Sequence, residues 1–179
     1  ARAQNVKISL DGKNVPSWDP FCVKESTIAS EQSKIVEISG TSTAVFTMKA
    51  YVLPRKEEFS NDKAAKTAQI SNEKQGVYIY RQNRLIHGPD WLGLFSKEPH
   101  LSLLRVEFSF DHELDDAFQV DIKKSQIILD ETIYKCVEEF LTPPRRAADE
   151  TYRKGKKAET SQIAVKAHDS SNRNISSKE

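Results

Sequence analysis

Few cysteines, few glycines and no long apolar run set the first limits on this chain. Its 179 residues include two cysteines and six glycines; 37% are hydrophobic and 30% are charged. No apolar stretch approaches the roughly 20 residues that a membrane-spanning helix needs, so we expect a soluble protein. Cys22 and Cys136 are far apart and lie in no C-x-x-C motif. This predicts two reduced thiols in a cytoplasmic protein rather than a disulfide framework or a metal site.

The spacing of the six glycines excludes a phosphate-binding loop within this chain. None falls in G-x-G-x-x-G or in G-x-x-x-x-G-K-[ST], so any ATP chemistry would depend on a site in another domain. The four histidines are spread singly, and no G-x-S-x-G motif is present. We therefore expect no catalytic residue, no metal site and no cofactor bound by this chain alone.

Charge is unevenly distributed along the sequence. The net charge is +1, but the segment from Pro143 onward holds nine Lys/Arg against five Asp/Glu, and the part before it is net negative. A basic surface over the whole protein is therefore not expected. The basic tail is the one segment that could attract nucleic acid electrostatically.

Alternating apolar residues predict strands over most of the first 120 residues. They fall in NVKISLDGKNV, KIVEISG, TAVFTMKAYVLP, GVYIYRQNRLI, LLRVEFSF and FQVDI, with hairpin turns at Asp11-Gly12, Gly40-Thr41-Ser42 and Gln82-Asn83. In LLRVEFSF the polar set is Arg105, Glu107 and Ser109, which predicts a half-buried strand with these residues on its unburied side. Residues 55–74 predict a loop or a short surface helix, and HGPDWLGLF predicts a turn-rich link.

The segment ILDETIYKCVEEFL predicts an amphipathic helix with Asp130 as its N-cap. The apolar positions on one face of this helix are Ile133, Val137, Phe140 and Leu141. Pro143-Pro144 should end the helix, and Thr142 should cap a second, polar helix through RRAADETYRKGKK. From about Ala158 to Glu179 the composition predicts a disordered or weakly structured segment.

These elements predict an α+β fold of two layers, in which helices cover one face of a mostly antiparallel sheet. We expect one domain over 1–142, followed by a polar helix and flexible basic tail over 143–179. The chain starts without Met and without a signal-peptide pattern, which predicts a piece of a longer protein.

Basic residues are interspersed with aromatic residues in YIYRQNRLIHGPDW, and this pattern has two interpretations. In the first, Tyr78, Tyr80 and Trp91 are core or sheet-face aromatics, and Arg81 and Arg84 flank a hairpin turn. In the second, the same residues form an aromatic and basic platform for single-stranded nucleic acid. The first is the commoner arrangement, and we favour it.

The order of QGVYIYRQNRLIHGPDWLGL, LLRVEFSFD, FQVDIKKSQI and a helix resembles the second, transducer domain of the GHKL ATPases. This superfamily contains gyrase B, heat-shock chaperones, MutL and MORC, and the likeness is greatest to bacterial chaperone-like or MORC-like ATP-binding proteins. VKISLDGKNVPSWDPF resembles the opening of that domain, so the likeness runs from Asn5 to Leu141. It implies a left-handed βαβ crossover in the sheet, an exception to the usual handedness.

The resemblance also implies a lysine that contacts phosphate. Transducer domains present a lysine, from a loop after a strand, to the terminal phosphate of ATP bound in the neighbouring domain. Gyrase-type members carry it in a Q-T-K-T-K-L stretch. Set beside that stretch, IKKSQI matches Lys124 to the lysine, Ser125 to the threonine and Ile127 to the leucine, with Lys123 as the second choice. The alternative is that both lysines extend into water from a strand end.

By the same resemblance, the expected partner is an N-terminal ATP-binding domain of the same polypeptide, which would hold ATP and Mg. A homodimer of the parent protein and a DNA partner stay open, and no membrane contact is expected. The asparagine and glutamate helix, the D-x-G-x-G loop and the glycine lid of a GHKL site are missing, so this chain alone should have no ATPase activity. The expected function is coupling of ATP binding and hydrolysis to conformational change; the alternative is a nucleic-acid-binding α+β module.

Overall fold

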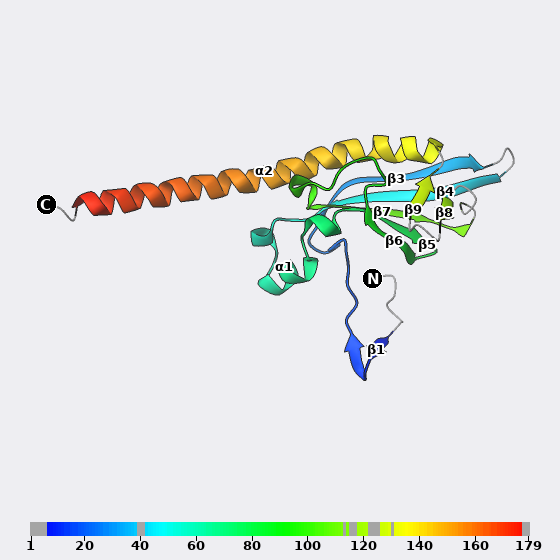
Figure 1. Ribbon diagram of the computed structural model, residues 1–179, viewed down its shortest axis with the longest axis horizontal. Coiled ribbons are helices and arrows are strands. Elements are labelled where there is room, and N and C mark those ends of the chain that lie inside the picture. The colour runs from blue at the N-terminus through cyan, green and yellow to red at the C-terminus, as the bar shows by residue number, and fades with distance from the viewer. Residues whose placement is uncertain are drawn as a thin grey trace.

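The computed structural model describes residues 7–38, 42–112, 114, 118–121, 126–129 and 131–176. Figure 1 shows a sheet with one long helix along it. The elements in chain order are β1 (Ile8–Leu10), β2 (Lys13–Val15), β3 (Thr27–Ile38), β4 (Ser42–Val52), η1 (Lys56–Glu58), α1 (Asp62–Ala68), η2 (Asn72–Lys74), β5 (Gly76–Arg81), β6 (Arg84–Asp90), η3 (Pro99–Leu101), β7 (Leu104–Phe110), β8 (Phe118–Asp121), β9 (Gln126–Leu129) and α2 (Glu131–Ser176).

A five-stranded sheet forms the body of the protein. Its strand order is β3-β4-β7-β5-β6, and every neighbouring pair is antiparallel except the parallel pair β5 and β7. The predicted two-layer α+β fold with a mostly antiparallel sheet is therefore confirmed. The left-handed βαβ crossover is not confirmed, because the chain passes from β5 to β7 through β6 and η3 rather than through an α-helix.

One face of the sheet, the helix face, is apolar because every second residue of its central strands is apolar. On β4 and β7, Phe46 pairs with Phe110 and Met48 with Phe108, and all four are buried. The rings of Phe46 and Phe108 stack at 4.9 Å between centroids. The buried apolar side chains that α2 contributes include Ile133, Val137, Phe140, Leu141 and Ala148. This helical spacing confirms the predicted amphipathic face, and each large side chain buried there contributes roughly 1.5–3 kcal/mol.

The predicted end of this helix at Pro143-Pro144 is wrong, because both prolines lie inside α2. The fixed φ of proline is compatible with a helix. Proline has no backbone N–H, however, so the carbonyls of Glu139 and Phe140 lose their helical hydrogen-bond donors. Leu141 and Ala148, on either side of the prolines, are both fully buried. Packing on both sides therefore holds the helix against the body and offsets the lost hydrogen bonds.

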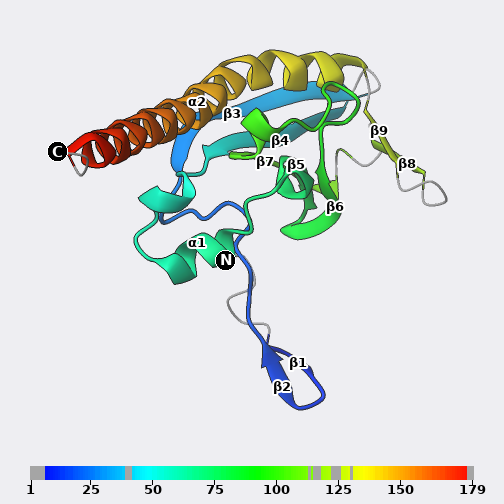
Figure 2. The ribbon, with the colours of Figure 1, turned by 60° about the vertical axis from the view of Figure 1, so that its left-hand side comes forward.

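After Ala158, where the composition predicts a disordered or weakly structured segment, the backbone is helical as far as Ser176. Extending an existing helix costs much less than starting one, and the packed first half of α2 supplies the start. At 1.5 Å per residue, the 46 residues of α2 span about 69 Å. Figures 1 and 2 show the later part of α2 extending well beyond the sheet.

The polar segment 55–74 contains the predicted short surface helix, α1. The Asn61 side chain caps it by accepting a hydrogen bond from the amide of Ala64 at 2.9 Å. Gln69 ends it in a left-handed conformation, with φ of 50°. Local capping therefore accounts for both ends of α1.

Strand β6 continues through HGPD to Asp90, so the predicted turn-rich link begins later than expected. Pro89 is tolerated because β6 is the last strand of the sheet order, where a missing amide costs no bond to a further strand.

Two small hairpins extend from the body (Figure 2). In β1–β2 the turn falls on Asp11 and Gly12, both with positive φ, as the sequence predicted. Strands β8 and β9 form the second hairpin. Cys22 and Cys136 are not joined by a disulfide. Within the part of the chain that the structure describes, no helix has the length and apolarity to cross a membrane.

Replacing Gly76 by alanine should strongly destabilise the fold. Gly76 opens β5 with φ of +126°, and an added Cβ would lie 2.8–2.9 Å from backbone atoms of Asp90. We expect the Gly76→Ala variant to lose about 3 kcal/mol of unfolding free energy in urea denaturation. Gly88→Ala in the facing strand is the control, because nothing lies within 4 Å of its added Cβ. Equal losses in the two variants would contradict this account of Gly76.

Candidate functional site

The lysines predicted to contact phosphate, Lys123 and Lys124, lie outside the described residues. The strands that flank them are described: Asp121 at the end of β8 pairs with Gln126 at the start of β9. The predicted strand in FQVDI is thus confirmed, whereas β9 was missed. The short apolar run of β9 is equally typical of a strand and of the start of a helix. In sequence the lysines therefore fall between two paired strand ends, and α2 begins two residues after Leu129.

Arg81 and Arg84 form the last register pair before the turn of the β5–β6 hairpin. The two turn residues, Gln82 and Asn83, have φ of 47° and 66°, which is typical of the tight turns that join antiparallel strands. The Gln82 amide donates to the carbonyl of Phe110 at 2.9 Å, so the turn lies against the end of β7. The structure thus confirms the predicted hairpin position of both arginines.

The aromatic residues of this region belong to the core. Tyr78 is 1% exposed and Trp91 is fully buried. The Tyr78 hydroxyl donates to the carbonyl of Lys74 at 2.8 Å, and the Trp91 indole donates to the side-chain oxygen of Gln75 at 3.1 Å. Tyr80 is half-buried, with its ring 6.1 Å from that of Phe21. Tyr78 and Trp91 therefore cannot stack on bases, and the core interpretation is confirmed for both.

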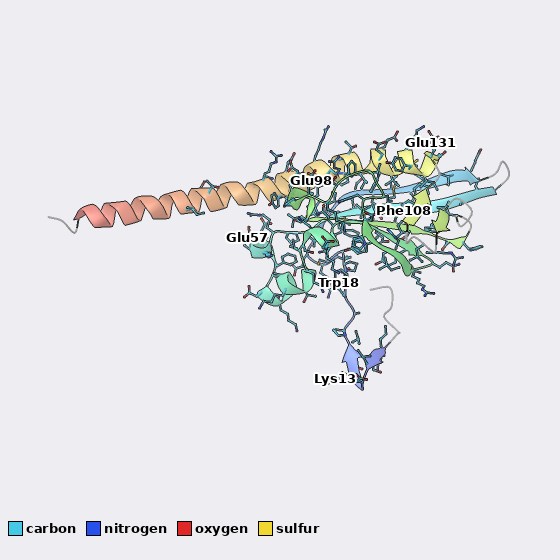
Figure 3. All side chains as sticks on the ribbon, in the orientation of Figure 1. Lys13, Trp18, Glu57, Glu98, Phe108 and Glu131 are labelled. Atoms are coloured by element: carbon cyan, nitrogen blue, oxygen red, sulfur yellow. The ribbon has the colours of Figure 1, made fainter. Side chains whose placement is uncertain are left out.

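The sheet face opposite α2 carries a buried arginine that sequence reasoning missed. Arg105 of β7 is 0% exposed, although the alternation of LLRVEFSF placed it on the unburied side. Its guanidinium donates to the carbonyls of Pro20, of Ala68 at 2.6 Å and of Gln69 at 3.2 Å. It lies 5.7 Å from the ring centre of Trp18. The Trp18 indole donates to the Thr67 carbonyl at 2.9 Å, and Figure 3 shows Trp18 on the side of the sheet away from α2.

The residues that bring Pro20 to Arg105 form a turn held by one carboxylate. Asp19 accepts hydrogen bonds from the amides of Phe21 at 3.0 Å and Val23 at 2.9 Å. Cys22 within this turn has a left-handed φ of 46°. The Phe21 ring stacks on Tyr51 at 4.9 Å and meets Tyr78 edge-on at 5.4 Å. The loop after β2 is thereby fixed to the sheet by aromatic packing as well as by Arg105.

Burial controls the ionisation of this cluster. It raises the pKa of Tyr78 to about 12, with Arg105 partly opposing the shift. Burial also raises the pKa of the Cys22 thiol, and the nearby Arg105 charge acts in the opposite direction. The pKa of Arg105 is lowered by burial. Thiol and phenol therefore stay protonated at neutral pH, so neither is an activated nucleophile.

The Arg105 cluster is thus a structural clamp rather than a catalytic site. It joins β7, the loop at Pro20 and the end of α1. Among the described residues, no group of three or more His, Cys, Asp and Glu side chains could hold a metal ion. No protein-family description, curated protein or solved structure matches the chain.

Replacing Arg105 by methionine should destabilise the protein by about 3 kcal/mol. The substitution keeps an extended side chain but leaves buried carbonyls without donors, each costing roughly 1–3 kcal/mol. Urea denaturation followed by Trp18 and Trp91 fluorescence would measure it. Arg84→Met is the matched control, because Arg84 is exposed at a turn. Equal losses of unfolding free energy in the two variants would show that the three carbonyl contacts of Arg105 do not stabilise the fold as expected.

The Tyr78→Phe variant should alter how stability depends on pH. The folded-state pKa of about 12 lies above the usual value near 10, so the fold keeps its full Tyr78 contribution below about pH 10. That contribution is lost as the pH rises towards 12, by about 1.4 kcal/mol at pH 11.

We expect Tyr78→Phe to cost about 1 kcal/mol at pH 7, because the Lys74 carbonyl loses its donor. Between pH 7 and pH 11 the variant should then lose about 1.4 kcal/mol less than the wild type. Urea denaturation at both pH values checks this. If the unfolding free energy of the two proteins depends on pH in the same way, burial does not raise the pKa of Tyr78.

Proposed function

We propose that this chain is the transducer domain of a larger GHKL-type ATPase and couples ATP binding and hydrolysis in a preceding domain to conformational change. One observation supports the coupling role above the others. A single helix, α2, begins two residues after the β8–β9 hairpin, packs along the sheet and continues well beyond it (Figure 1). The segment that carries Lys124 is thus followed in the chain by the short strand β9 and then by a long helix.

The physical basis of the proposal is that a helix transmits movement along its length. Residues Ile133 and Val137 fix the first turns of α2 on the sheet, and Ala148 fixes a later turn. A displacement that reaches the start of α2 is therefore carried to its distal part along one helix. The same geometry would carry a conformational change in either direction.

In this proposal Lys124 contacts the terminal phosphate of ATP, with Lys123 as the second choice. An ammonium on a four-carbon stem can neutralise a phosphate oxygen across a domain boundary without demanding bidentate geometry. The contact exists only while the terminal phosphate does, so ATP favours the closed arrangement of the two domains and hydrolysis releases it. Arg81 and Arg84 serve as hairpin and interface residues.

The partner in this proposal is the ATP-binding domain of the same polypeptide, which holds ATP and Mg. This chain contributes no catalytic residue and, by itself, no ATPase activity. A homodimer of the parent protein is compatible with this role. The rival nucleic-acid module gains no support from the structure, because Tyr78 and Trp91 are buried.

Substituting Lys124 in the parent protein tests this function. We expect Lys124→Ala to lower ATP turnover at least tenfold, because it removes a charged contact to the reacting phosphate, worth about 1.5–3 kcal/mol. Steady-state ATP hydrolysis measures the loss. Lys123→Ala is the matched control and should have the smaller effect.

The chain alone should show no ATP turnover. If Lys124→Ala and Lys123→Ala both leave turnover and ATP-induced domain closure unchanged, the proposed phosphate contact is wrong. A larger effect of Lys123→Ala would instead assign the contact to the second-choice lysine.

A further inference from the structure

A cavity of about 310 Å³ lies between α2 and η3, away from the β8–β9 hairpin. The residues that line it are His100, Leu101, Thr142, Arg145, Arg146 and Asp149. Four of these six come from α2 and two from η3, and the two elements are in contact. Figure 3 shows Glu98, just before η3, beside α2. The cavity is therefore formed where the helix crosses the short segment that precedes β7.

The first of the two arginines is held in place before any ligand arrives. The guanidinium carbon of Arg145 lies 3.7 Å from the centre of the Phe95 ring, so the planar group is positioned against an aromatic face. Its Nε atom is buried and has no hydrogen-bond partner among the described residues. A positioned guanidinium loses less conformational entropy when it binds a ligand than a freely moving side chain does.

Two acidic residues near the cavity, Asp149 and Glu98, already contact other groups. Asp149 accepts from Arg153, with 2.8 Å between Oδ2 and Nε. Glu98 lies 2.7 Å from the His100 ring. Over the described ranges, no carboxylate lies within ion-pair distance of Arg145 or Arg146. Neither of the two arginines that line the cavity therefore has an ion-pair partner among the described residues.

We propose that this cavity is an oxyanion site that takes a phosphate or diphosphate group of a small molecule. Arg145 and Arg146 supply the charge, because guanidinium forks match phosphate oxygens in geometry. The Thr142 hydroxyl, now in a long 3.4 Å hydrogen bond to the Glu138 carbonyl, is a further donor. This site does not depend on the proposed role of Lys124.

The surroundings of the cavity favour a small ligand over a nucleic acid. Glu98, Asp149 and Glu150 place negative charge next to the two arginines, whereas an extended phosphate backbone needs a continuous basic surface. The Phe95 face that could stack on a base is occupied by Arg145. The volume of about 310 Å³ also suits a compact diphosphate rather than a chain of nucleotides.

Titration of this chain with inorganic pyrophosphate at constant ionic strength, followed by calorimetry, tests the site. We expect one saturable site in the wild type and about tenfold weaker binding in Arg146→Gln, the loss of one charge-assisted contact. The control is Lys135→Gln, which removes one positive charge from an exposed position elsewhere on α2 and should change the affinity less than about twofold. Far-UV circular dichroism verifies that all variants remain folded.

A second pair of variants tests the sign of the charge effect. Asp149→Asn removes the carboxylate that the described residues contribute to the lining and should tighten pyrophosphate binding about threefold or more. Glu150→Gln makes the same change in net charge at the neighbouring exposed position, outside the lining, and should have a smaller effect.

Absence of saturable binding in the wild type would overturn the site. Equal weakening by Arg146→Gln and Lys135→Gln would overturn it too, because it would reduce the binding to general charge attraction. Tighter binding of a single-stranded oligonucleotide than of pyrophosphate, lost in Arg146→Gln, would overturn the assignment to a small ligand.

Discussion

The buried guanidinium of Arg105 is the interaction on which the arrangement of the outer segments depends. It sits on a sheet strand and donates to backbone carbonyls of the loop at Pro20 and of the end of α1, at Ala68 and Gln69. Burying a charge is costly unless polar partners surround it, so the segments that supply these carbonyls must stay in place. In turn, those segments bury Tyr78 and half-bury Cys22, which keeps both protonated at neutral pH.

The opposite face of the sheet obeys a different constraint, which is apolar packing by one long helix. Because Leu141 and Ala148 are buried on both sides of Pro143-Pro144, packing replaces the hydrogen bonds that the prolines remove. The helix can therefore run unbroken from Glu131 to Ser176. The sheet holds α2 on one side and the Arg105 clamp on the other, so the two halves of the core are stabilised by different forces.

Most of the fold could be predicted from local sequence patterns. The features that could not be predicted depend on contacts between distant parts of the chain. Period-two alternation and the Gln82-Asn83 turn located the strands of the sheet, because these signals depend on neighbouring residues. The burial of Arg105 could not be predicted, since its partners are 36 to 85 residues away in the chain. Likewise, a proline pair is locally a stop signal, and only the packing of Leu141 and Ala148 overrides it. The arginine pair on α2 carried no motif, because its cavity depends on contact with η3.

Two arginines of this protein show how the same side chain can serve structure or binding. Around Arg105, backbone carbonyls accept several of its hydrogen bonds, so little capacity is left for a ligand. Around Arg145, an aromatic ring fixes the guanidinium plane but accepts no conventional hydrogen bond, so the terminal N–H donors are not used by that contact. Arg146 adds a second charge at the same cavity, and the local carboxylates are engaged elsewhere. What distinguishes a structural arginine from a binding one here is therefore whether acceptors already surround it, and by that criterion the cavity between α2 and η3 has charge to offer an anion.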